Sequence, residues 1–370
     1  MENKSPSFSS FDLPPSILKS LAALGFQEPT AIQARSLPPA LEGKDVMGMA
    51  QTGTGKTGAF GIPMLVRLME LHQKTALVLA PTRELAMQIH SFLRKLAGKN
   101  ERLHVMLMIG GAPMSQQIRE LRQKPRILVA TPGRLVDHLN RDRQILSHCG
   151  ILVLDEADRM LDMGFLPQLK VVQKHLPRQR QTLMFSATFP ASVRKLAADY
   201  LYKPVEVEIG QASRPVQKIE QTIIETTQKE KNDILLDELN ARKGSVLIFT
   251  RTKHRTDRLS RYLESYGYQV SRLHGDRTQA QRRQAIDGFR SGAFRILVAT
   301  DIAARGLDID HIQHVINYDL PQVPEDYIHR VGRTARNGKS GQALCLLTPE
   351  DRSQWRSIAK VAGLNPHKRD

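Results

Sequence analysis

The hexamer RILVAT stands at residues 126–131 and again, letter for letter, at residues 295–300. Its apolar centre is typical of a strand that is buried on both faces of a parallel sheet. Each copy leads into a polar loop that contains arginine. One copy alone would fit any buried strand, but the order of elements around the two copies also agrees. The repeat therefore predicts two α/β lobes of similar build in one chain.

Further apolar runs surround both copies, with longer helix-like segments between many of them. They are TALVLA (75–80), VMLMIG (105–110), ILVL (151–154) and TLMFSAT (182–188), then SVLIFT (245–250), HVINYD (314–319) and ALCLLT (343–348). This alternation predicts two α/β domains, each a mostly parallel sheet with helices on both faces. A length of 370 residues also favours two domains. We place them at residues 1–209 and 219–370, joined by the short polar linker GQASRPVQK at 210–218.

The charge balance is strongly basic, with 54 Lys and Arg against 37 Asp and Glu and a formal net charge of +17. Between Arg242 and Arg295, thirteen Lys or Arg stand against four Asp or Glu. Such an excess of positive charge favours binding of a polyanion, above all nucleic acid, although basic surfaces also serve solubility or membrane contact. Only 5% of the residues are aromatic. A large base-stacking platform is therefore not expected, and the nucleic-acid backbone is the expected point of contact.

Two further features bear on the compartment. Cys149 and Cys345 are isolated from each other and from histidine-rich segments. We expect them to be small buried residues of a reducing compartment and not a disulfide or a zinc site. The chain has no run of eighteen apolar residues, and its first residues, MENKSPSFSS, lack an apolar signal core. The expectation is a soluble, cytoplasmic protein without membrane contact.

The segment AQTGTGKT (50–57) matches a phosphate-binding loop, except that Ala50 stands where the strict pattern has glycine. Gly53 and Gly55 allow the backbone amides to turn toward an anion. Lys56 would supply charge to the β- and γ-phosphates, and Thr57 would offer its hydroxyl to Mg²⁺. A simple Gly/Thr-rich turn is the alternative, but the GKT ending between a strand and a helix favours the phosphate site.

The acidic partner of such a loop is found in ILVLDEAD (151–158). Asp155 can hold Mg²⁺ through water, and Glu156 can orient and deprotonate an attacking water. Acidic residues also cap the starts of helices, so this motif alone is moderate evidence. Together with the loop about 100 residues upstream, it predicts that a nucleoside triphosphate is bound and hydrolysed.

Near the carboxyl end, HRVGRTARNGK (329–339) places a basic residue at every third position. Three interpretations fit this cluster by itself. It could be a solvated helix face, a groove for nucleic-acid backbone, or a set of arginines that reach a phosphoryl group.

The motifs taken together resemble those of DEAD-box RNA helicases, which are ATPases with two tandem RecA-like domains. The first lobe has AQTGTGKT, PTRELA (81–86), GG (110–111), TPGR (131–134), DEAD (155–158) and SAT (186–188). The second has VLIFTRT (246–252), QAQR (279–282), TDIAARGLD (300–308) and HRVGRTAR (329–336). The resemblance runs from about Phe8 to about Thr348. The context DEADRMLDMGF most resembles the bacterial RhlE-type branch.

The resemblance implies roles for residues around ATP. In GFQEPTAIQ (25–33), Gln33 would bond the edge of the adenine, for which an amide is suited because it offers a donor beside an acceptor. Phe8 would stack on the base, and Asp308 would contact the ribose. Arg333 and Arg336 would act as arginine fingers, worth about 10³–10⁵ in rate. Arg330 would position its neighbours, and Lys339 would be a solvated charge.

The resemblance thus implies two sets of residues at the nucleotide. The implied ATP-binding residues are Phe8, Phe26, Gln33, Gln51, Thr52, Gly53, Thr54, Gly55, Lys56, Thr57, Gly306, Asp308, Arg333 and Arg336. Among these and the acidic motif, the implied catalytic residues are Lys56, Asp155, Glu156, Arg333 and Arg336, with Thr57 and Asp155 at Mg²⁺.

The resemblance also implies an RNA-binding surface. Its contacts would be Arg83, Gly111, Thr131 and Arg134 in the first lobe and Gly275, Arg282 and Thr300 in the second. Amides, hydroxyls and guanidiniums suit phosphate oxygens and do not read sequence, whereas contacts to 2′-hydroxyls would separate RNA from DNA. Asp158, Ser186, Thr188 and His329 would couple this surface to the ATP site.

The expected mechanism is a two-state clamp, in which ATP and RNA each complete contacts that only the closed form makes. Closure would bend one strand of a short duplex, so that strands separate locally and without processive translocation. Two rivals remain at this point, a DNA translocase and a non-catalytic ATP-gated RNA clamp. The resemblance further suggests ribosome-assembly or RNA-turnover partners, and a monomer is the default expectation.

Overall fold

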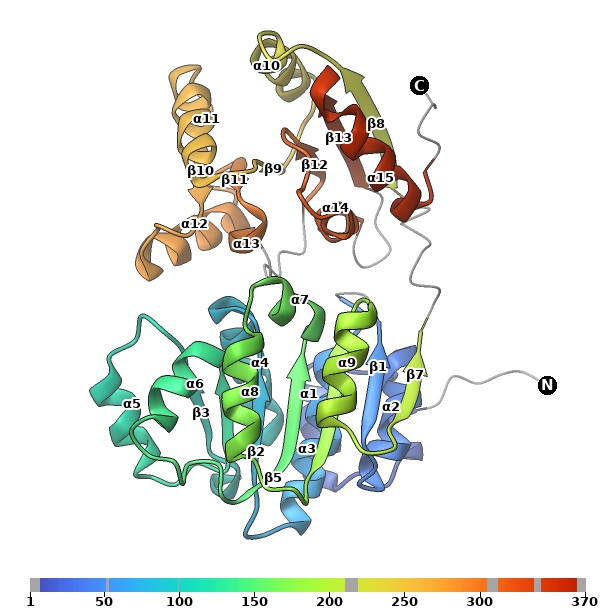
Figure 1. Cartoon of the computed structure of the whole chain (residues 1–370), viewed down its shortest axis with the longest axis vertical. Coiled ribbons are helices and arrows are strands. Elements are labelled where there is room, and N and C mark those ends of the chain that lie inside the picture. Colours follow the sequence, from blue (N-terminus) through green and yellow to red (C-terminus); the bar gives the residue numbers. More distant parts are fainter. Residues whose placement is uncertain are drawn as a thin grey trace, which may run out of the picture. The chain divides into compact units, whose positions relative to one another are not determined.

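The computed structural model describes residues 7–50, 53–98, 100–209, 219–304, 312–335 and 341–364. The chain divides into two compact units, Met1–Ala212 and Ser213–Asp370. The segment expected to link the domains, 210–218, lies outside the described residues. Each unit is an α/β domain built on its own parallel sheet (Figure 1).

The sheet of the first domain has the strand order β3-β4-β2-β5-β6-β1-β7, and each pair of neighbours is parallel. Its strands are β1 Val46–Met49, β2 Thr75–Leu79, β3 Val105–Met108, β4 Ile127–Ala130, β5 Cys149–Asp155, β6 Gln181–Ser186 and β7 Val205–Glu208. Its α-helices are α1 Pro15–Ala23, α2 Ala31–Leu41, α3 Lys56–Glu70, α4 Arg83–Ala97, α5 Met114–Leu121, α6 Pro132–Leu139, α7 Ala157–Asp162, α8 Leu166–His175 and α9 Ala191–Tyr200. Two short 3₁₀ helices, η1 Phe8–Ser10 and η2 Glu101–Leu103, complete it.

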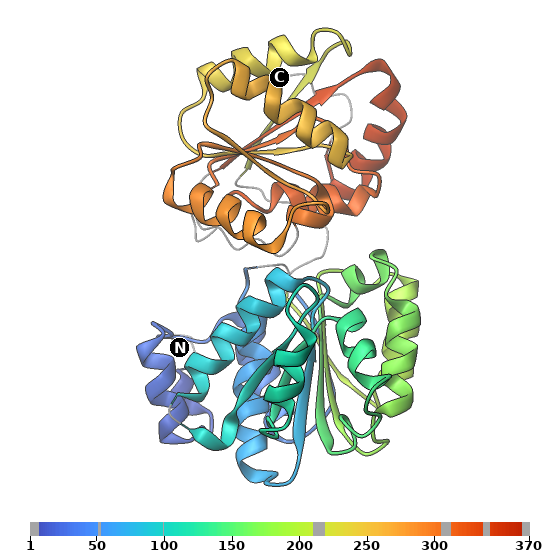
Figure 2. The ribbon, with the colours of Figure 1, turned by 90° about the vertical axis from the view of Figure 1, so that its left-hand side faces the viewer.

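Helices cover both faces of this sheet, as the sequence predicts (Figure 2). Successive strand residues point to opposite faces, so Ile151 and Val153 pack with α1 to α4, whereas Leu152 and Leu154 pack with α6 to α9. The strand residues are apolar almost without exception because both faces are buried. Cys149, at the start of β5, is a free and fully buried thiol.

The second domain has the strand order β10-β11-β9-β12-β13-β8, again parallel at each pair. Its strands are β8 Ile219–Glu225, β9 Val246–Phe249, β10 Val270–Leu273, β11 Ile296–Ala299, β12 His314–Asn317 and β13 Gly341–Leu347. Its helices are α10 Lys231–Ala241, α11 Lys253–Ser265, α12 Gln279–Ser291, α13 Asp301–Ala304, α14 Pro324–Val331, η3 Pro349–Asp351 and α15 Arg352–Ala362. Trp355 and Ile358, three residues apart on α15, are buried in its core.

The two copies of RILVAT occupy equivalent strands. Residues Ile127–Ala130 form β4 between β3 and β2, and residues Ile296–Ala299 form β11 between β10 and β9. The threonine that ends each copy continues the pairing, because Thr131 N donates to Met108 O at 3.0 Å and Thr300 N donates to Leu273 O at 3.2 Å. Both threonines therefore stand at the carboxyl edge of their sheet.

The arginine that begins each copy has an equivalent role at the opposite edge. Arg126 donates to the carbonyls of Leu68 and Leu71 at the end of α3 and of Lys74 before β2. Arg295 donates to the carbonyls of Leu239 and Arg242 at the end of α10 and of Gly244 before β9. The last carbonyls of a helix have no intrahelical partner. In each domain, one guanidinium satisfies these carbonyls and joins the helix end to the sheet.

Candidate functional site

The phosphate-binding loop enters α3 through a glycine in the left-handed region. Gly55 has φ +90° and precedes Lys56, the first residue of the helix. A Cβ at Gly55 would lie 2.6 Å from Gln33 Nε2, so both conformation and space require glycine there. The Lys56 side chain is buried, and its Nζ has no hydrogen-bond partner among the described residues. A buried ammonium at a helix amino terminus is a strong anion site. Gln51 and Thr52 lie outside the described residues.

The acidic motif begins at the carboxyl end of β5, where Asp155 is the last strand residue and is 2% exposed. Burial and, to a lesser degree, the neighbouring Glu156 raise the pKa of Asp155 to about 7, against the opposing charge of Lys56. Because the charge of Lys56 acts on Asp155, the structure brings the glycine-rich loop and the acidic strand end together. In the described residues no cluster of three His, Cys, Asp or Glu forms a metal cage.

Glu156 has φ +52° and ψ +53°, an uncommon conformation for a residue other than glycine. Its backbone N donates to Asp155 Oδ1 at 3.0 Å. Its carboxylate accepts a hydrogen bond from Arg159 Nη1 at 2.9 Å, and both side chains are buried. Glu156 is thereby held by charge and by backbone in one orientation beside Asp155.

Asp158 connects the acidic motif to the end of β6. Its Oδ2 accepts hydrogen bonds from Ala187 N at 3.2 Å, Thr188 N at 3.0 Å and Thr188 Oγ1 at 3.0 Å. In return, Asp158 N donates to Ser186 Oγ at 3.2 Å. The residues expected to couple the two surfaces within the first domain, Asp158, Ser186 and Thr188, are therefore in direct contact.

The segment expected to recognise adenine packs against the phosphate loop. Gln33 is fully buried, and its Nε2 donates to Gly55 O at 2.9 Å while its Oε1 accepts from Thr30 N at 3.0 Å. Phe8 is 4% exposed, and its ring centroid lies 6.2 Å from that of Phe26. In this structure the Gln33 amide binds protein groups at both ends.

Four residues expected at RNA gather around one loop of the first domain. Gly111 has φ +84°, and a Cβ there would lie 2.6 Å from Arg83 Nη1, so the guanidinium rests on the glycine. Arg134 Nη2 donates to Ala112 O at 2.9 Å in the same loop. Thr131 caps α6 and is joined to the end of β3. The set therefore forms one surface at the carboxyl edge of the sheet.

The corresponding residues of the second domain also lie at its carboxyl edge. Gly275 is exposed after β10, Arg282 Nη1 donates to His274 O at 3.4 Å, and Thr300 follows β11. The expected contacts of this domain are thus grouped at the ends of β10 and β11, as those of the first domain are at β3 and β4.

Of the basic cluster HRVGRTARNGK (329–339), the structure describes residues 329–335. Arg330 is buried, donates to both carboxylate oxygens of Asp301 and to Asn317 Oδ1, and lies over the Phe249 ring. This is the positioning role expected of it. His329 Nδ1 lies 3.6 Å from Asp326 Oδ1, and Arg333 is 4% exposed. Gly306, Asp308, Arg336 and Lys339 lie outside the described residues.

Comparison with known proteins decides the family. Residues 30–196 match the family model of DEAD/DEAH box helicases, and residues 230–338 match that of the helicase conserved C-terminal domain. The ATP-dependent RNA helicase CshA of Listeria monocytogenes is 44% identical over 356 residues, which are 96% of this chain and 68% of that protein. The chain belongs to the DEAD-box ATP-dependent RNA helicases. It is therefore an ATP-hydrolysing enzyme, and a DNA translocase or a non-catalytic clamp is not favoured.

Other relatives agree on the family but not on the branch. The DEAD-box helicase CshA of Bacillus subtilis is 43% identical over 96% of this chain and 72% of its own length. These relatives are named CshA, so the expected RhlE-type branch is not confirmed.

Solved DEAD-box helicase structures confirm the tandem RecA-like fold. Dbp5 of Saccharomyces cerevisiae bound to RNA and ADP BeF3 matches with a TM-score of 0.86 and 34% identity, over 96% of this chain and 93% of that chain. Mss116p bound to ssRNA and AMP-PNP matches with a TM-score of 0.90 and 27% identity, over 100% of this chain and 80% of that chain. No helix in the described part of this helicase is long and apolar enough to span a membrane.

Two positioning residues of this helicase escaped the sequence analysis. Arg159 orients Glu156, and the only signal for it was a basic residue three positions after an acidic one, which is common on helix surfaces. Thr30 fixes Gln33 through a capping box at the start of α2. The pattern Thr-x-x-Gln is a known signature of a helix start and could have predicted this contact.

Proposed function

We propose that Lys56 binds the β- and γ-phosphates of ATP and that Glu156 is the base that deprotonates the attacking water. The carrying observation is the buried Lys56 Nζ, which has no hydrogen-bond partner among the described residues and lies within the electrostatic reach of Asp155. A buried cation without a partner is costly unless a ligand supplies the anion. Arg159 Nη1 holds the Glu156 carboxylate through a hydrogen bond of 2.9 Å.

We further propose that Mg²⁺ is bound with the nucleotide by the Thr57 hydroxyl and, through water, by Asp155. The residues fit this ion, since Mg²⁺ favours one or two protein oxygens together with substrate phosphates over a complete protein cage. When bound, the ion would neutralise charge on the transferring phosphoryl group. Gln33, with Phe8 and Phe26, would hold the adenine, which requires the Gln33 amide to exchange part of its present bonding to Gly55 and Thr30.

The second domain would complete the site when the clamp closes. Arg333 and Arg336 would stabilise the charge that develops on the equatorial oxygens of the phosphoryl group. Gly306 and Asp308 would contact the nucleotide, and His329 would couple the two domains. Lys339 stays a predicted solvated charge.

We propose that RNA is bound through its backbone by Arg83, Gly111, Thr131 and Arg134, and by Gly275, Arg282 and Thr300. Support comes from their grouping at the carboxyl edge of each sheet, where the Arg83 guanidinium rests on Gly111 and Arg134 donates to Ala112 O. The three hydrogen bonds from Ala187 and Thr188 to Asp158 would transmit the state of the ATP site to this surface. RNA and ATP would favour the same closed form, so that short duplexes are opened locally.

The test is ATP hydrolysis by the full chain alone, with single-stranded RNA and with DNA of equal sequence. We expect strong stimulation by RNA and little by DNA. Glu156→Gln keeps the shape and hydrogen-bonding capacity of the side chain, so ATP and RNA binding should persist while turnover falls by at least about 10². Retained turnover in this variant would refute Glu156 as the base. Equal stimulation by DNA would refute recognition through 2′-hydroxyls.

Four further assignments are proposed. The RhlE-type branch, suggested by DEADRMLDMGF, and partners from ribosome assembly or RNA turnover rest on the family resemblance. A cytoplasmic location rests on the isolated cysteines and the apolar pattern, and a monomeric state is the default. Size-exclusion chromatography with light scattering would test the monomer directly.

A further inference from the structure

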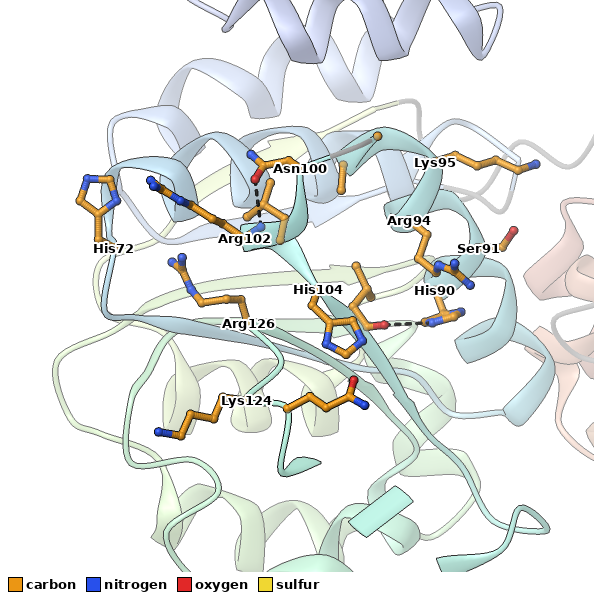
Figure 3. Close-up of a pocket in the computed structure, with 15 residues that line it drawn as sticks. His72, His90, Ser91, Arg94, Lys95, Asn100, Arg102, His104, Lys124 and Arg126 are labelled. Carbon is orange, nitrogen blue, oxygen red and sulfur yellow. Dashed lines mark hydrogen bonds between the residues drawn. The ribbon is translucent and has the colours of Figure 1, made fainter. Parts of the chain in front are cut away.

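A second basic feature of the first domain includes none of the residues assigned above to ATP or to RNA. It is a pocket of about 1060 Å³ between the carboxyl end of α4, the segment around η2 and the turn before β4 (Figure 3). Arg94 and Lys95 reach it from α4, Arg102 from η2, and Lys124 from the turn. Arg126, whose guanidinium joins the end of α3 to the sheet, lies on its floor. We call it the α4 pocket.

The α4 pocket has an uncompensated positive charge. Five of its lining residues are Lys or Arg, and none of those that the structure describes is Asp or Glu. Arg94, Lys95, Arg102 and Lys124 are exposed, and none of them forms an ion pair within the described residues. At the rim, the acidic Glu120 lies 3.6 Å from His104. The pKa of His90 is lowered by burial and also by the charges of Arg94 and His104, although its bond to Val105 opposes this.

The chemistry of the lining selects the kind of ligand. No aromatic ring other than histidine lines the pocket among the described residues, and its few apolar members include Ala97 and Leu103. A base or an apolar ligand would find little to stack on or to pack against. Long, flexible cations around an open hollow instead suit the phosphates of a polyanion.

The position of the pocket relative to α4 connects it with RNA. Arg83 begins α4 at the proposed RNA surface, and Arg94 stands eleven residues later on the same helix. At about 1.5 Å per residue, the two arginines are roughly 17 Å apart along the helix axis. Strand β3 makes the same connection, because it starts at the pocket with Val105 and ends near Gly111. One RNA could therefore contact both ends of this rigid unit.

We propose that the α4 pocket is a second RNA-binding site, which holds the phosphate backbone of RNA that extends beyond the segment bound at the carboxyl edge. It adds electrostatic affinity for long RNA and contributes no sequence selectivity. The proposal depends on the chain being an RNA helicase but not on the individual contacts proposed above. Its effect is confined to RNA that is long enough to reach from one end of α4 to the other.

The test measures binding of the full chain, with a non-hydrolysable ATP analogue, to two labelled single-stranded RNAs over a range of salt concentrations. The RNAs have about 5 and about 40 nucleotides, since at about 3.4 Å or more per nucleotide only the longer one can cover the carboxyl edge and also reach the pocket. The variant carries Lys95→Gln, Arg102→Gln and Lys124→Gln, three exposed side chains that form no hydrogen bond or ion pair within the described residues. A matched control carries Lys170→Gln, Lys174→Gln and Lys195→Gln. These are equally exposed and lie on α8 and α9, over the other face of the sheet. A charge-keeping variant, Lys95→Arg with Arg102→Lys and Lys124→Arg, tests whether charge alone suffices.

For the long RNA, three lost phosphate contacts should reduce the slope of log K against log salt by about 2, since each contact to a single strand contributes about 0.7. Binding of the short RNA, and ATP hydrolysis stimulated by it, should be unchanged, and the charge-keeping variant should behave like the wild type. An unchanged slope in the pocket variant, or an equal reduction in the control, would overturn the proposal. If the wild type does not bind the short RNA at all, the proposed RNA surface at the carboxyl edge is contradicted instead. Failure of the pocket proposal and failure of the proposed RNA surface therefore give different results.

Discussion

Arg159 and Glu156 form a buried ion pair three residues apart, with Nη1 2.9 Å from Oε2 and side chains that are only 1% and 6% exposed. The pair crosses the first turn of α7. Glu156 itself has a left-handed backbone, so the carboxylate is directed by the chain on one side and by the guanidinium on the other. A charge pair buried to this degree tolerates the loss of neither partner.

Arg159→Met therefore tests the pair directly. Removing the cation leaves a buried carboxylate without its partner, which should lower the free energy of unfolding by about 3–5 kcal/mol. Because Glu156 is then no longer held in one orientation, RNA-stimulated turnover should also fall by about tenfold or more. Urea unfolding and steady-state ATP hydrolysis measure the two effects. The exposed Arg178→Met is the control, and wild-type stability and turnover in Arg159→Met would show that the pair positions nothing.

The second prediction concerns Gln33, whose amide joins the start of α2 to the phosphate loop. Gln33→Ala removes the donor to Gly55 O and the acceptor of Thr30 N, each a buried bond worth about 1 kcal/mol. We expect an increase in KM for ATP and a loss of about 1–2 kcal/mol in the free energy of unfolding. The exposed Gln27→Ala should change neither.

A comparison of ATP with GTP separates the two roles of Gln33. If Gln33 also bonds the adenine, its loss should reduce the preference for ATP over GTP. An equal increase in KM for both nucleotides would assign it to the loop alone.

The repeated hexamer shows what the sequence could and could not predict. Its apolar centre was sufficient to place β4 and β11, because a strand buried on both faces is recognisable from composition alone. The roles of Arg126 and Arg295 were not predictable, since their partners are backbone carbonyls about 50 residues away that any sequence would supply. The motifs likewise predicted that the glycine-rich loop belongs beside the acidic strand end, where the charge of Lys56 acts on Asp155, but they did not predict that Arg159 orients Glu156. Long-range contacts to backbone leave little trace in a single sequence.

Arg126 and Arg295 give the third prediction, which uses one domain as the control for the other. Arg126→Met should expose the last carbonyls of α3, and Arg295→Met those of α10. Hydrogen bonds from a charged donor are worth about 1.5–3 kcal/mol. Hydrogen exchange of amides at that helix end should therefore accelerate by about tenfold or more in the mutated domain only. The exposed Arg122→Met and Arg283→Met are the surface controls. Faster exchange in both domains from either single change would contradict this local role.

The last prediction is that the free energy of unfolding falls in mild acid and that His138 contributes to this fall. His138 is 1% exposed, and its Nε2 lies 2.8 Å from Gln117 Oε1. Because Gln117 Nε2 donates to Ile109 O, its Oε1 faces the imidazole and accepts from Nε2 of the neutral ring. Burial lowers the pKa of His138, and the charge of Arg134 lowers it further. The unfolded chain therefore takes up a proton near pH 6.5 that the folded domain resists.

The sign follows from this difference in proton uptake. The stabilising effect is complete above pH 6.5 and is lost as the pH falls below it, toward the lowered pKa of the folded state. Burial also lowers the pKa of His90 and His314, so both domains contribute in the same direction. Urea unfolding at several pH values between about 7.5 and 5.5 should show a decrease, and His138→Gln, which cannot titrate, should make it shallower. The exposed His72→Gln should leave the pH dependence as it is, and an unchanged slope in His138→Gln would show that the folded state binds the proton as readily as the unfolded chain.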